Sequence, residues 1–181
     1  MSQRIEKLAI GNHIIAIYNT GEEKFQEAFE FLTQGLNRNE VAMLITEELT
    51  KKEIIEILKR NFKIHNVEEL IDKGDFIVKS TSEWYFPDGV PSYQRTKAMW
   101  AELINIIAKR GKVGLRVVGD VSAFFKYGLQ KDLIQYEASL EQKFDFPLTA
   151  ICAYNRADLS KYLTAEEIKS IEEHHYQFRN S

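Results

Sequence analysis

Thiol, imidazole and carboxylate side chains that could together bind a metal ion occur in three separate segments of the sequence. His13 directly precedes the run "IIAIY", and Cys152, the only cysteine, lies within "LTAICAY". The late segment "EEHH" adds His174 and His175. Such groups together can bind zinc or iron, but no two of them have the spacing of a metal motif such as CxxC or HxxxH. A metal site therefore remains a hypothesis, with candidate ligands His13, Cys152 and His175; the alternative is that Cys152 is a small apolar core side chain.

The segment "YNTGEEKF" (18–25) lies between an apolar run and a helical pattern, where a phosphate-binding loop would stand. A working loop needs several glycines and a Gly-Lys-Ser/Thr triplet, whereas this segment has only Gly21 and no such triplet. Glu22 and Glu23 fall in the first helical turn, where they complement the helix dipole and would repel a polyphosphate. Lys24 offsets only one of these charges. We therefore expect no ATP to bind here.

Acidic residues follow two other apolar runs. Glu47 and Glu48 lie where nucleotide-hydrolysing proteins place acidic residues. Asp120 follows Gly119 near the end of the run 113–121 and would suit a metal–phosphate group. The commoner role of a lone aspartate at such a position is to cap the next turn, here through Ser122 or a backbone N–H.

Arg116 lies inside the same apolar run, and a buried arginine needs a carboxylate or a ligand anion as its partner. Glu137, one residue off the apolar stripe of the following helix, is a candidate. The pair would serve structure or ligand binding, and we favour the structural interpretation.

Residues 82–95, "SEWYFPDGVPSYQR", follow neither a helical nor a strand pattern and are expected to form a loop. They concentrate Trp84, Tyr85, Phe86 and Tyr93 around a Pro-Asp-Gly turn. Aromatic side chains form good walls for small apolar ligands, and they can equally pin a long loop to the core. We predict that residues 84–93 form a wall or lid that faces a ligand.

The elements that position these residues alternate in period. Short apolar segments typical of buried strands occupy residues 13–18, 40–46, 75–81, 113–121 and 148–154. Between them the apolar spacing is helical, and helix starts and stops are indicated by the capping-box pairs Thr50/Glu53 and Thr164/Glu167 and by Gly74 and Gly111. This alternation predicts one α/β domain over residues 1–181, with a mainly parallel central sheet covered by helices on both faces. Ligands of such sheets bind at the carboxyl ends of the strands.

Composition excludes several classes of protein. The 181 residues carry a net charge of −3, with a pI of about 5.9 and 44% apolar residues. The absence of a basic surplus argues against direct binding to nucleic acid or to an anionic membrane. No apolar run approaches the length of a membrane span, and the N-terminal segment is a poor signal peptide. With one cysteine, these features favour the cytoplasm.

The chain resembles the MEDS family over about residues 8 to 178. The resemblance is carried by six segments in order: "GNHIIAIY", "FLTQGLNRNEVAMLIT", "VGLRVVGDVSAFF", "QYEASL", "LTAICAYN" and "EEHH". These are sensory domains named for methanogens, methylotrophs and a dichloromethane-responsive regulator. The resemblance implies a RecA/KaiC-like three-layer sandwich without an intact phosphate loop, in agreement with residues 18–25. It also implies a sensor of small organic molecules, proposed to be simple hydrocarbon derivatives.

The resemblance also marks individual positions. Those that look typical of the family are His13, Arg116, Glu137, Cys152 and one of the two late histidines. The chain departs from the family in having Gly-Asp at 119–120, where Gly-Glu is usual. It also lacks the kinase or DNA-binding module that such sensors often carry, so the output is expected to pass through a partner.

Three functions stay open at this point. The first is a sensor of a small organic ligand that signals through a partner such as a histidine kinase or a transcription regulator, with homo-oligomers allowed. The second is an enzyme, either a degenerate KaiC-like ATPase or a protein that uses the Cys152 thiol with a histidine base. The third is a scaffold for protein contacts. The candidate ligand-binding residues are His13, Tyr18, Trp84, Tyr85, Arg116, Asp120, Glu137, Cys152, Tyr154, His174 and His175.

Strand alternation sharpens one of these expectations. His13, Ile15 and Ile17 share one face of their strand, and Cys152 and Tyr154 share one face of theirs. If the faces coincide on neighbouring strands, imidazole and thiol meet over a pocket closed by the last helix. An imidazolium would lower the thiol pKa and make the thiol reactive, whereas apolar burial would raise the pKa and leave it inert.

Overall fold

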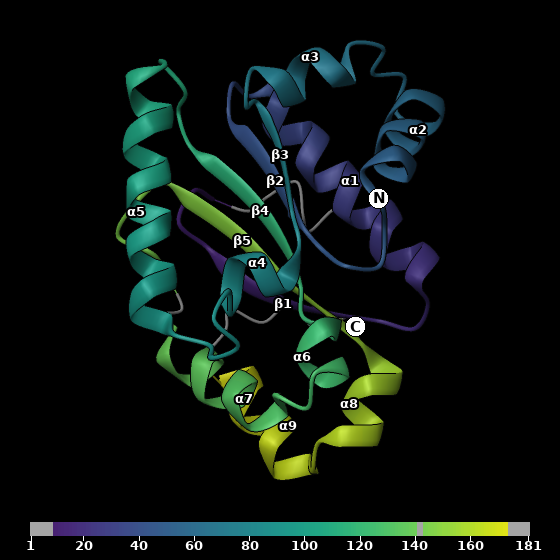
Figure 1. The fold of residues 1–181 in the computed structure, drawn as a ribbon, viewed down its shortest axis with the longest axis vertical. Helices are drawn as coiled ribbons and strands as arrows, with labels where there is room; N and C mark the ends of the chain where they lie inside the picture. Colours follow the sequence, from purple (N-terminus) through teal and green to yellow (C-terminus); the bar gives the residue numbers. More distant parts are fainter. Residues whose placement is uncertain (1–8, 141–142, 174–181) are drawn as a thin grey trace.

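Five parallel strands form the centre of the protein in a computed structural model, which describes residues 9–140 and 143–173 (Figure 1). The strands are β1 (His13–Tyr18), β2 (Val41–Ile45), β3 (Phe76–Lys79), β4 (Leu115–Asp120) and β5 (Leu148–Asn155). Their order across the sheet is β1-β5-β4-β2-β3, and every neighbouring pair is parallel. All five predicted strands are confirmed, because uninterrupted apolar runs suit strands that are covered on both faces.

Helices cover both faces of this sheet, which makes three layers (Figure 1). The helices are α1 (Gly21–Asn37), α2 (Lys51–Asn61), α3 (Val67–Asp72), α4 (Thr81–Tyr85), α5 (Tyr93–Lys109), α6 (Ser122–Lys126), α7 (Gln130–Ser139), α8 (Arg156–Tyr162) and α9 (Ala165–Glu173). Helices α1, α2 and α3 pack on one face, and α4 to α9 pack on the other. The predicted α/β fold with helices on both faces is confirmed.

The predicted helix boundaries follow local chemistry. Thr50 and Glu53 form a reciprocal capping box at the start of α2. Thr164 and Glu167 exchange the same pair of hydrogen bonds before α9. Gly74 follows α3 and Gly111 follows α5, at φ angles of +69° and +76° that a residue with a side chain rarely adopts.

The prediction of a loop over residues 82–95 is wrong at both ends of that segment. Helix α4 begins at Thr81, where the Ser80 side chain accepts a hydrogen bond from the Glu83 N–H, and it extends to Tyr85. Helix α5 begins at Tyr93 because Ser92 caps it in the same way. Serine is a favoured N-cap residue, and two such caps leave a short irregular segment between the helices.

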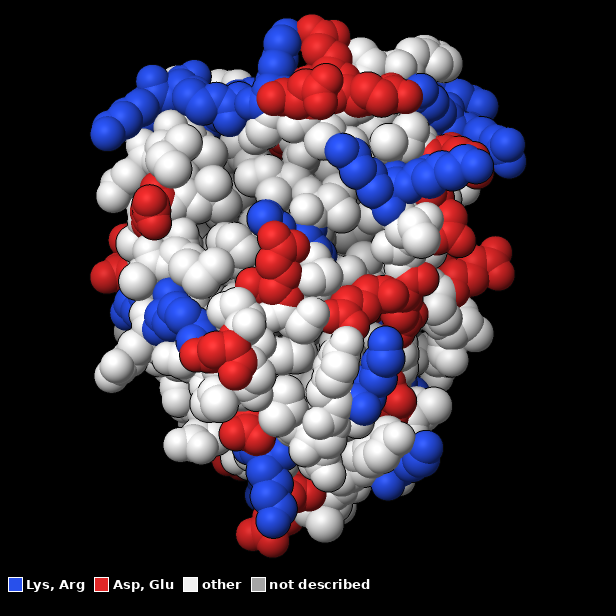
Figure 2. All heavy atoms as spheres, viewed as in Figure 1, with Lys and Arg blue, Asp and Glu red and all other residues white. Residues whose placement is uncertain are grey.

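Acidic and basic side chains are interspersed on the face drawn in Figure 2, without a broad area of one sign. Within the described part of the chain, no helix has the length and apolar character needed to cross a membrane.

Candidate functional site

The imidazole of His13 and the thiol of Cys152 meet on one face of the sheet. Strands β1 and β5 are neighbours, with Ile15 opposite Cys152 and His13 opposite Ala150, so alternation turns both side chains to the same side. The Nε2 atom of His13 lies 3.0 Å from the Sγ atom of Cys152, and both residues are buried. The expected meeting of imidazole and thiol is therefore present in the structure.

A carboxylate and a phenol complete this group of side chains. Helix α7 turns its buried stripe of Leu133, Tyr136 and Glu137 toward the sheet. A carboxylate oxygen of Glu137 lies 3.8 Å from the Cys152 sulfur, and the Tyr154 hydroxyl donates a hydrogen bond of 2.6 Å to the other oxygen. We call His13, Glu137, Cys152 and Tyr154 the thiol cluster.

Burial decides the state of the thiol. Removal from water, and then the nearby charge of Glu137, raise the pKa of Cys152 well above its ordinary value of 9.0. Of the two opposing influences considered from the sequence, burial is the stronger, so the thiol is protonated at neutral pH when no metal ion is bound.

The expected pairing of Arg116 with Glu137 is wrong. On β4, Val117 faces the thiol cluster, and Arg116 therefore points to the opposite face. There its guanidinium donates hydrogen bonds to the Glu40 carboxylate at 2.7 Å and to the Phe31 carbonyl at 3.2 Å. The structural interpretation of Arg116 stands with Glu40 as the partner, on the other side of the sheet from the thiol cluster.

A small cavity of about 20 Å³ adjoins the thiol cluster. His13 and Cys152 form part of its wall, and aromatic rings form much of the rest: Tyr85, Trp100, Tyr136 and Phe144. Gly119 also lines it, and a Cβ atom there would lie 2.4 Å from the Tyr85 hydroxyl. A glycine in β4 thus makes room for the Tyr85 ring to reach the cavity.

The aromatic residues 84–86, predicted to be part of a wall that faces a ligand, take different positions in the structure. Tyr85 lines the cavity, whereas Trp84 packs on Trp100 with ring centroids 4.6 Å apart and Phe86 packs on Phe124 at 4.9 Å. Trp84 and Phe86 are thus core residues, which agrees with the alternative that the aromatics pin the segment.

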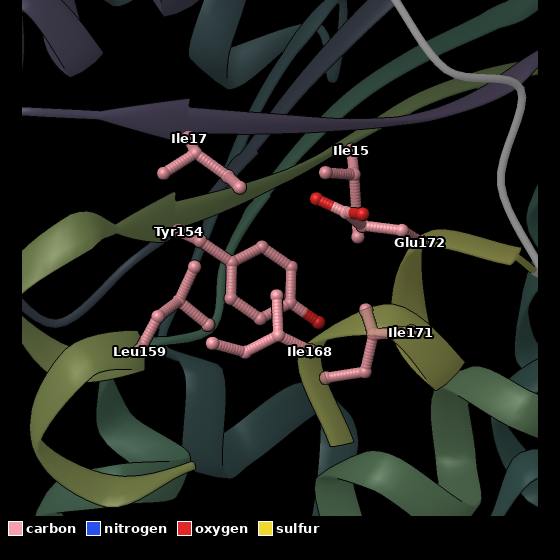
Figure 3. A pocket seen from close by; sticks show the side chains of 7 residues that line it. All are labelled: Ile15, Ile17, Tyr154, Leu159, Ile168, Ile171 and Glu172. Atoms are coloured by element: carbon pink, nitrogen blue, oxygen red, sulfur yellow. The ribbon is translucent and has the colours of Figure 1, made fainter. Parts of the chain in front are cut away.

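Helix α9 covers the neighbouring part of the same face. Figure 3 shows Ile168, Ile171 and Glu172 of this helix around the Tyr154 ring, opposite Ile15 and Ile17 of β1. They enclose a void of about 10 Å³. The candidates His174 and His175 directly follow α9 and lie outside the described residues.

A second polar group, in which Lys24 and Asp120 are buried and Glu48 is exposed, lies at the carboxyl ends of the strands. The Lys24 ammonium contacts the carboxylate of Asp120 at 3.1 Å and that of Glu48 at 2.9 Å. Asp120 also accepts hydrogen bonds from the Thr46 hydroxyl at 2.7 Å and from the Ser122 N–H at 3.1 Å. Asp120 thus caps the turn through Ser122, as the commoner role of a lone aspartate predicts. We call Lys24, Glu48 and Asp120 the lysine network.

Tyr18 ends β1 on the α1 face, away from the thiol cluster. It is buried beside Glu27, and burial together with that carboxylate raises the pKa of the Tyr18 hydroxyl far above its ordinary value. Tyr18 does not line the cavity beside Cys152.

An open groove of about 580 Å³ lies beside the lysine network. It runs along the carboxyl ends of β2, β4 and β5, the edge where ligands of parallel sheets usually bind. Its residues are Glu47, Glu48, Ser122, Ala123, Phe125, Lys126, Asn155, Asp158 and Tyr162.

Several residues around these sites were missed from the sequence. Tyr136, Trp100, Phe144 and Gly119 line the cavity, but nothing in their sequence pattern indicates a cavity. Lys24 has a signal in hindsight: it stands four and eight residues before Ala28 and Leu32 on the buried side of α1. Its charge made a solvent-facing position the natural assumption.

Comparison with known proteins bears on both fold and family. No curated protein matches the chain significantly. A crystal structure of the flagellar accessory protein FlaH from Methanocaldococcus jannaschii aligns with a TM-score of 0.50 at 11% identity, covering 98% of this chain and 77% of that one. Such low identity shows the fold alone, which is RecA-like.

The sequence profile of MEDS, the MEthanogen/methylotroph, DcmR Sensory domain, matches residues 12–175, from the strand with His13 to beyond α9. The chain therefore belongs to the MEDS family of sensory domains.

Proposed function

We propose that this sensory domain binds a small organic molecule in the cavity beside Cys152 and signals through a partner protein. The observation that carries the proposal is the meeting of the buried thiol cluster with a cavity walled by aromatic rings. Binding sites for small molecules are mostly apolar, with a few convergent polar groups that fix orientation. This cavity has that composition.

Cavity size restricts the ligand. A volume of about 20 Å³ holds about one water molecule. A ligand of several heavy atoms must therefore displace a wall residue. Tyr85 is the wall residue best placed to move, because it ends the five-residue helix α4, next to the irregular segment that leads to α5.

Helix α4 also connects the cavity with the groove. At its start, the Thr81 hydroxyl donates to the Asp120 carbonyl at 3.0 Å, and the Ser82 N–H donates to the Glu47 carboxylate at 3.0 Å. A displacement of Tyr85 would move α4 against Glu47, which lines the groove. We infer that the groove surface changes when the ligand binds, and that a partner such as a histidine kinase or a transcription regulator reads this change.

A thermal-shift screen with small alcohols, amines and halocarbons tests the proposal. A ligand that binds only the folded state stabilises it by about 2.7 kcal/mol at a concentration 100-fold above its Kd. We expect a shift with at least one compound class and its loss in Ala150→Val, which fills the cavity wall.

The control is Ala101→Val, which adds the same two carbon atoms at an exposed position of α5 and should keep the shift. If no compound stabilises the wild type, or if Ala150→Val responds as the control does, the cavity is not the binding site. A scaffold without a ligand would give the first of these results.

A further inference from the structure

We propose that the thiol cluster binds one divalent transition-metal ion, zinc(II) by its donor atoms, through Cys152, His13 and Glu137. This inference rests on the proposed sensory function only for the role of the ion, and its binding is tested separately. The three side chains come from β5, β1 and α7, are all buried, and offer one sulfur, one nitrogen and one oxygen within 4.8 Å of one another.

The distances suit coordination of one ion. In a tetrahedral zinc site, with bonds of about 2.3 Å to sulfur and about 2.0 Å to nitrogen or oxygen, neighbouring donor atoms stand about 3.2 to 3.6 Å apart. Here the nitrogen and sulfur are 3.0 Å apart, and the sulfur and carboxylate oxygen are 3.8 Å apart. Shifts of a few tenths of an ångström would bring both pairs to the required separation.

Charge also favours a divalent ion. A thiolate and a carboxylate carry two negative charges between them, and a neutral imidazole adds none. A divalent cation balances this sum, so the loaded site is neutral in an apolar interior. Binding releases the thiol proton, because the metal ligand is the thiolate.

The surrounding residues orient the ligands as the outer shell of a metal site does. The Tyr154 hydroxyl holds one Glu137 oxygen at 2.6 Å and leaves the other directed toward the sulfur. The His13 ring lies against the Phe144 ring, with centroids 5.4 Å apart. Such outer contacts fix the position of metal ligands and raise metal affinity.

Three protein ligands leave one position of a tetrahedral ion open. His13 and Cys152 also line the cavity with Tyr85 and Tyr136, so the open position would face that space. This selects ligands that have a lone pair on a small apolar body, such as a short alcohol, amine or thiol. A hydrocarbon without such an atom would gain nothing from the ion.

Cobalt(II) absorption tests the site, because cobalt bound by a thiolate has a sulfur-to-metal charge-transfer band in the near ultraviolet. The chain has one cysteine, so such a band reports Cys152 alone. Untagged protein stripped with a chelator should develop the band on titration with cobalt(II), saturating at one ion per chain, and zinc(II) should abolish it. Cys152→Ser should lack the band, Glu137→Gln should require more cobalt, and Tyr154→Phe should weaken binding by about 10- to 100-fold.

His65→Ala is the matched control, because His65 is exposed on the opposite side of the sheet from the cluster. It should bind cobalt as the wild type does, and circular dichroism should show each variant to be folded. Absence of the band in folded, stripped wild type overturns the metal site, as does equal binding by Glu137→Gln. Ligand-induced thermal shifts that persist in stripped protein would then leave the sensory proposal standing. A cobalt band without any ligand-induced thermal shift would support the metal site and contradict the proposal that the cavity binds a small organic molecule.

Discussion

The lysine network and the thiol cluster lie on opposite faces of one sheet and differ in their charge balance. The lysine network contains its own cation: Lys24 lies between Asp120 and Glu48. The thiol cluster consists of a thiol, an imidazole, a carboxylate and a phenol, three of which are potential metal ligands. The first is complete as a structural unit, whereas the second has the composition of a binding site beside a cavity.

If the proposed site is correct, position at the carboxyl end of a parallel sheet does not by itself identify where the ligand binds. The lysine network occupies the edge where RecA-like sheets are expected to bind ligands, yet its side chains are engaged with one another. The thiol cluster lies within one helix-covered face, away from that edge. Buried groups that are complementary to one another stabilise a fold, and buried groups that share a preference for a third species can bind it.

The largest effect is expected when the lysine network loses its cation. Lys24→Ala leaves Asp120 buried without its ammonium partner, which should lower the free energy of unfolding by about 3–5 kcal/mol. Urea denaturation measures this change. Lys59→Ala is the control, because its ion pair with Glu68 is exposed and should change stability by less than about 1 kcal/mol. Equal effects of the two substitutions would remove the structural role assigned to Lys24.

A smaller loss is expected in the thiol cluster. Cys152→Ala removes one sulfur atom from the edge of a cavity and should cost about 1 kcal/mol in metal-free protein, measured in the same urea experiment. Leu133→Ala, on the same face, removes a fully buried side chain and should cost about 2–5 kcal/mol. A cost for Cys152→Ala as large as that for Leu133→Ala would make the thiol a structural residue like Lys24.

Acid should weaken the lysine network gradually. Burial alone would raise the pKa of Glu48, but hydrogen bonds from Lys24 and Asn155 outweigh it and bring the pKa below its ordinary value of 4.5. A group with a lowered pKa stabilises the folded state above its unfolded pKa, and this contribution is lost as the pH falls through the folded value. We therefore expect stability to decrease as the pH is lowered below about 4.5. In Glu48→Gln this part of the decrease should be absent; an unchanged pH profile would contradict the prediction.

No effect is expected from ATP. Calorimetry with ATP–Mg should show no binding at micromolar concentrations, which are on the order of those that saturate a working site. Lys24 is held by Asp120 and Glu48. In addition, Glu22 and Glu23 in the first turn of α1 would repel the phosphates. Micromolar binding that disappears in Lys24→Ala would show that the lysine network binds nucleotide and is not only a structural unit.

The sequence predicted the strands and the sheet type well, because buried parallel strands are short, uninterrupted apolar runs and several helices start or stop at capping residues. It did not predict which charged residues pair. The partner of Arg116 depends on which face of β4 it occupies, and Glu40 precedes the strand next to it. The burial of Lys24 was not predicted, because a charged side chain is expected to face solvent even where its helical position is on the buried side.

The thiol cluster could be predicted only in part. Alternation placed His13 and Cys152 each on a definite face, but their contact depends on β1 and β5 being neighbours, which the order of strands along the chain does not reveal. The cavity depends on the missing side chain of Gly119 and on the angle at which Tyr85 leaves α4. Neither leaves a periodic pattern in the sequence.

The strand order has a consequence for the time at which the parts of this protein form. β1 is an edge strand whose neighbour is β5, and 139 residues separate His13 from Cys152. Of the five strands, β1 is synthesised first, but it cannot pair until β5 has been synthesised. Strands β2, β3 and β4 can pair with one another before then. The contact between imidazole and thiol is accordingly among the last to form during synthesis, and the nascent chain cannot assemble the three metal donors until almost all of the described fold has emerged.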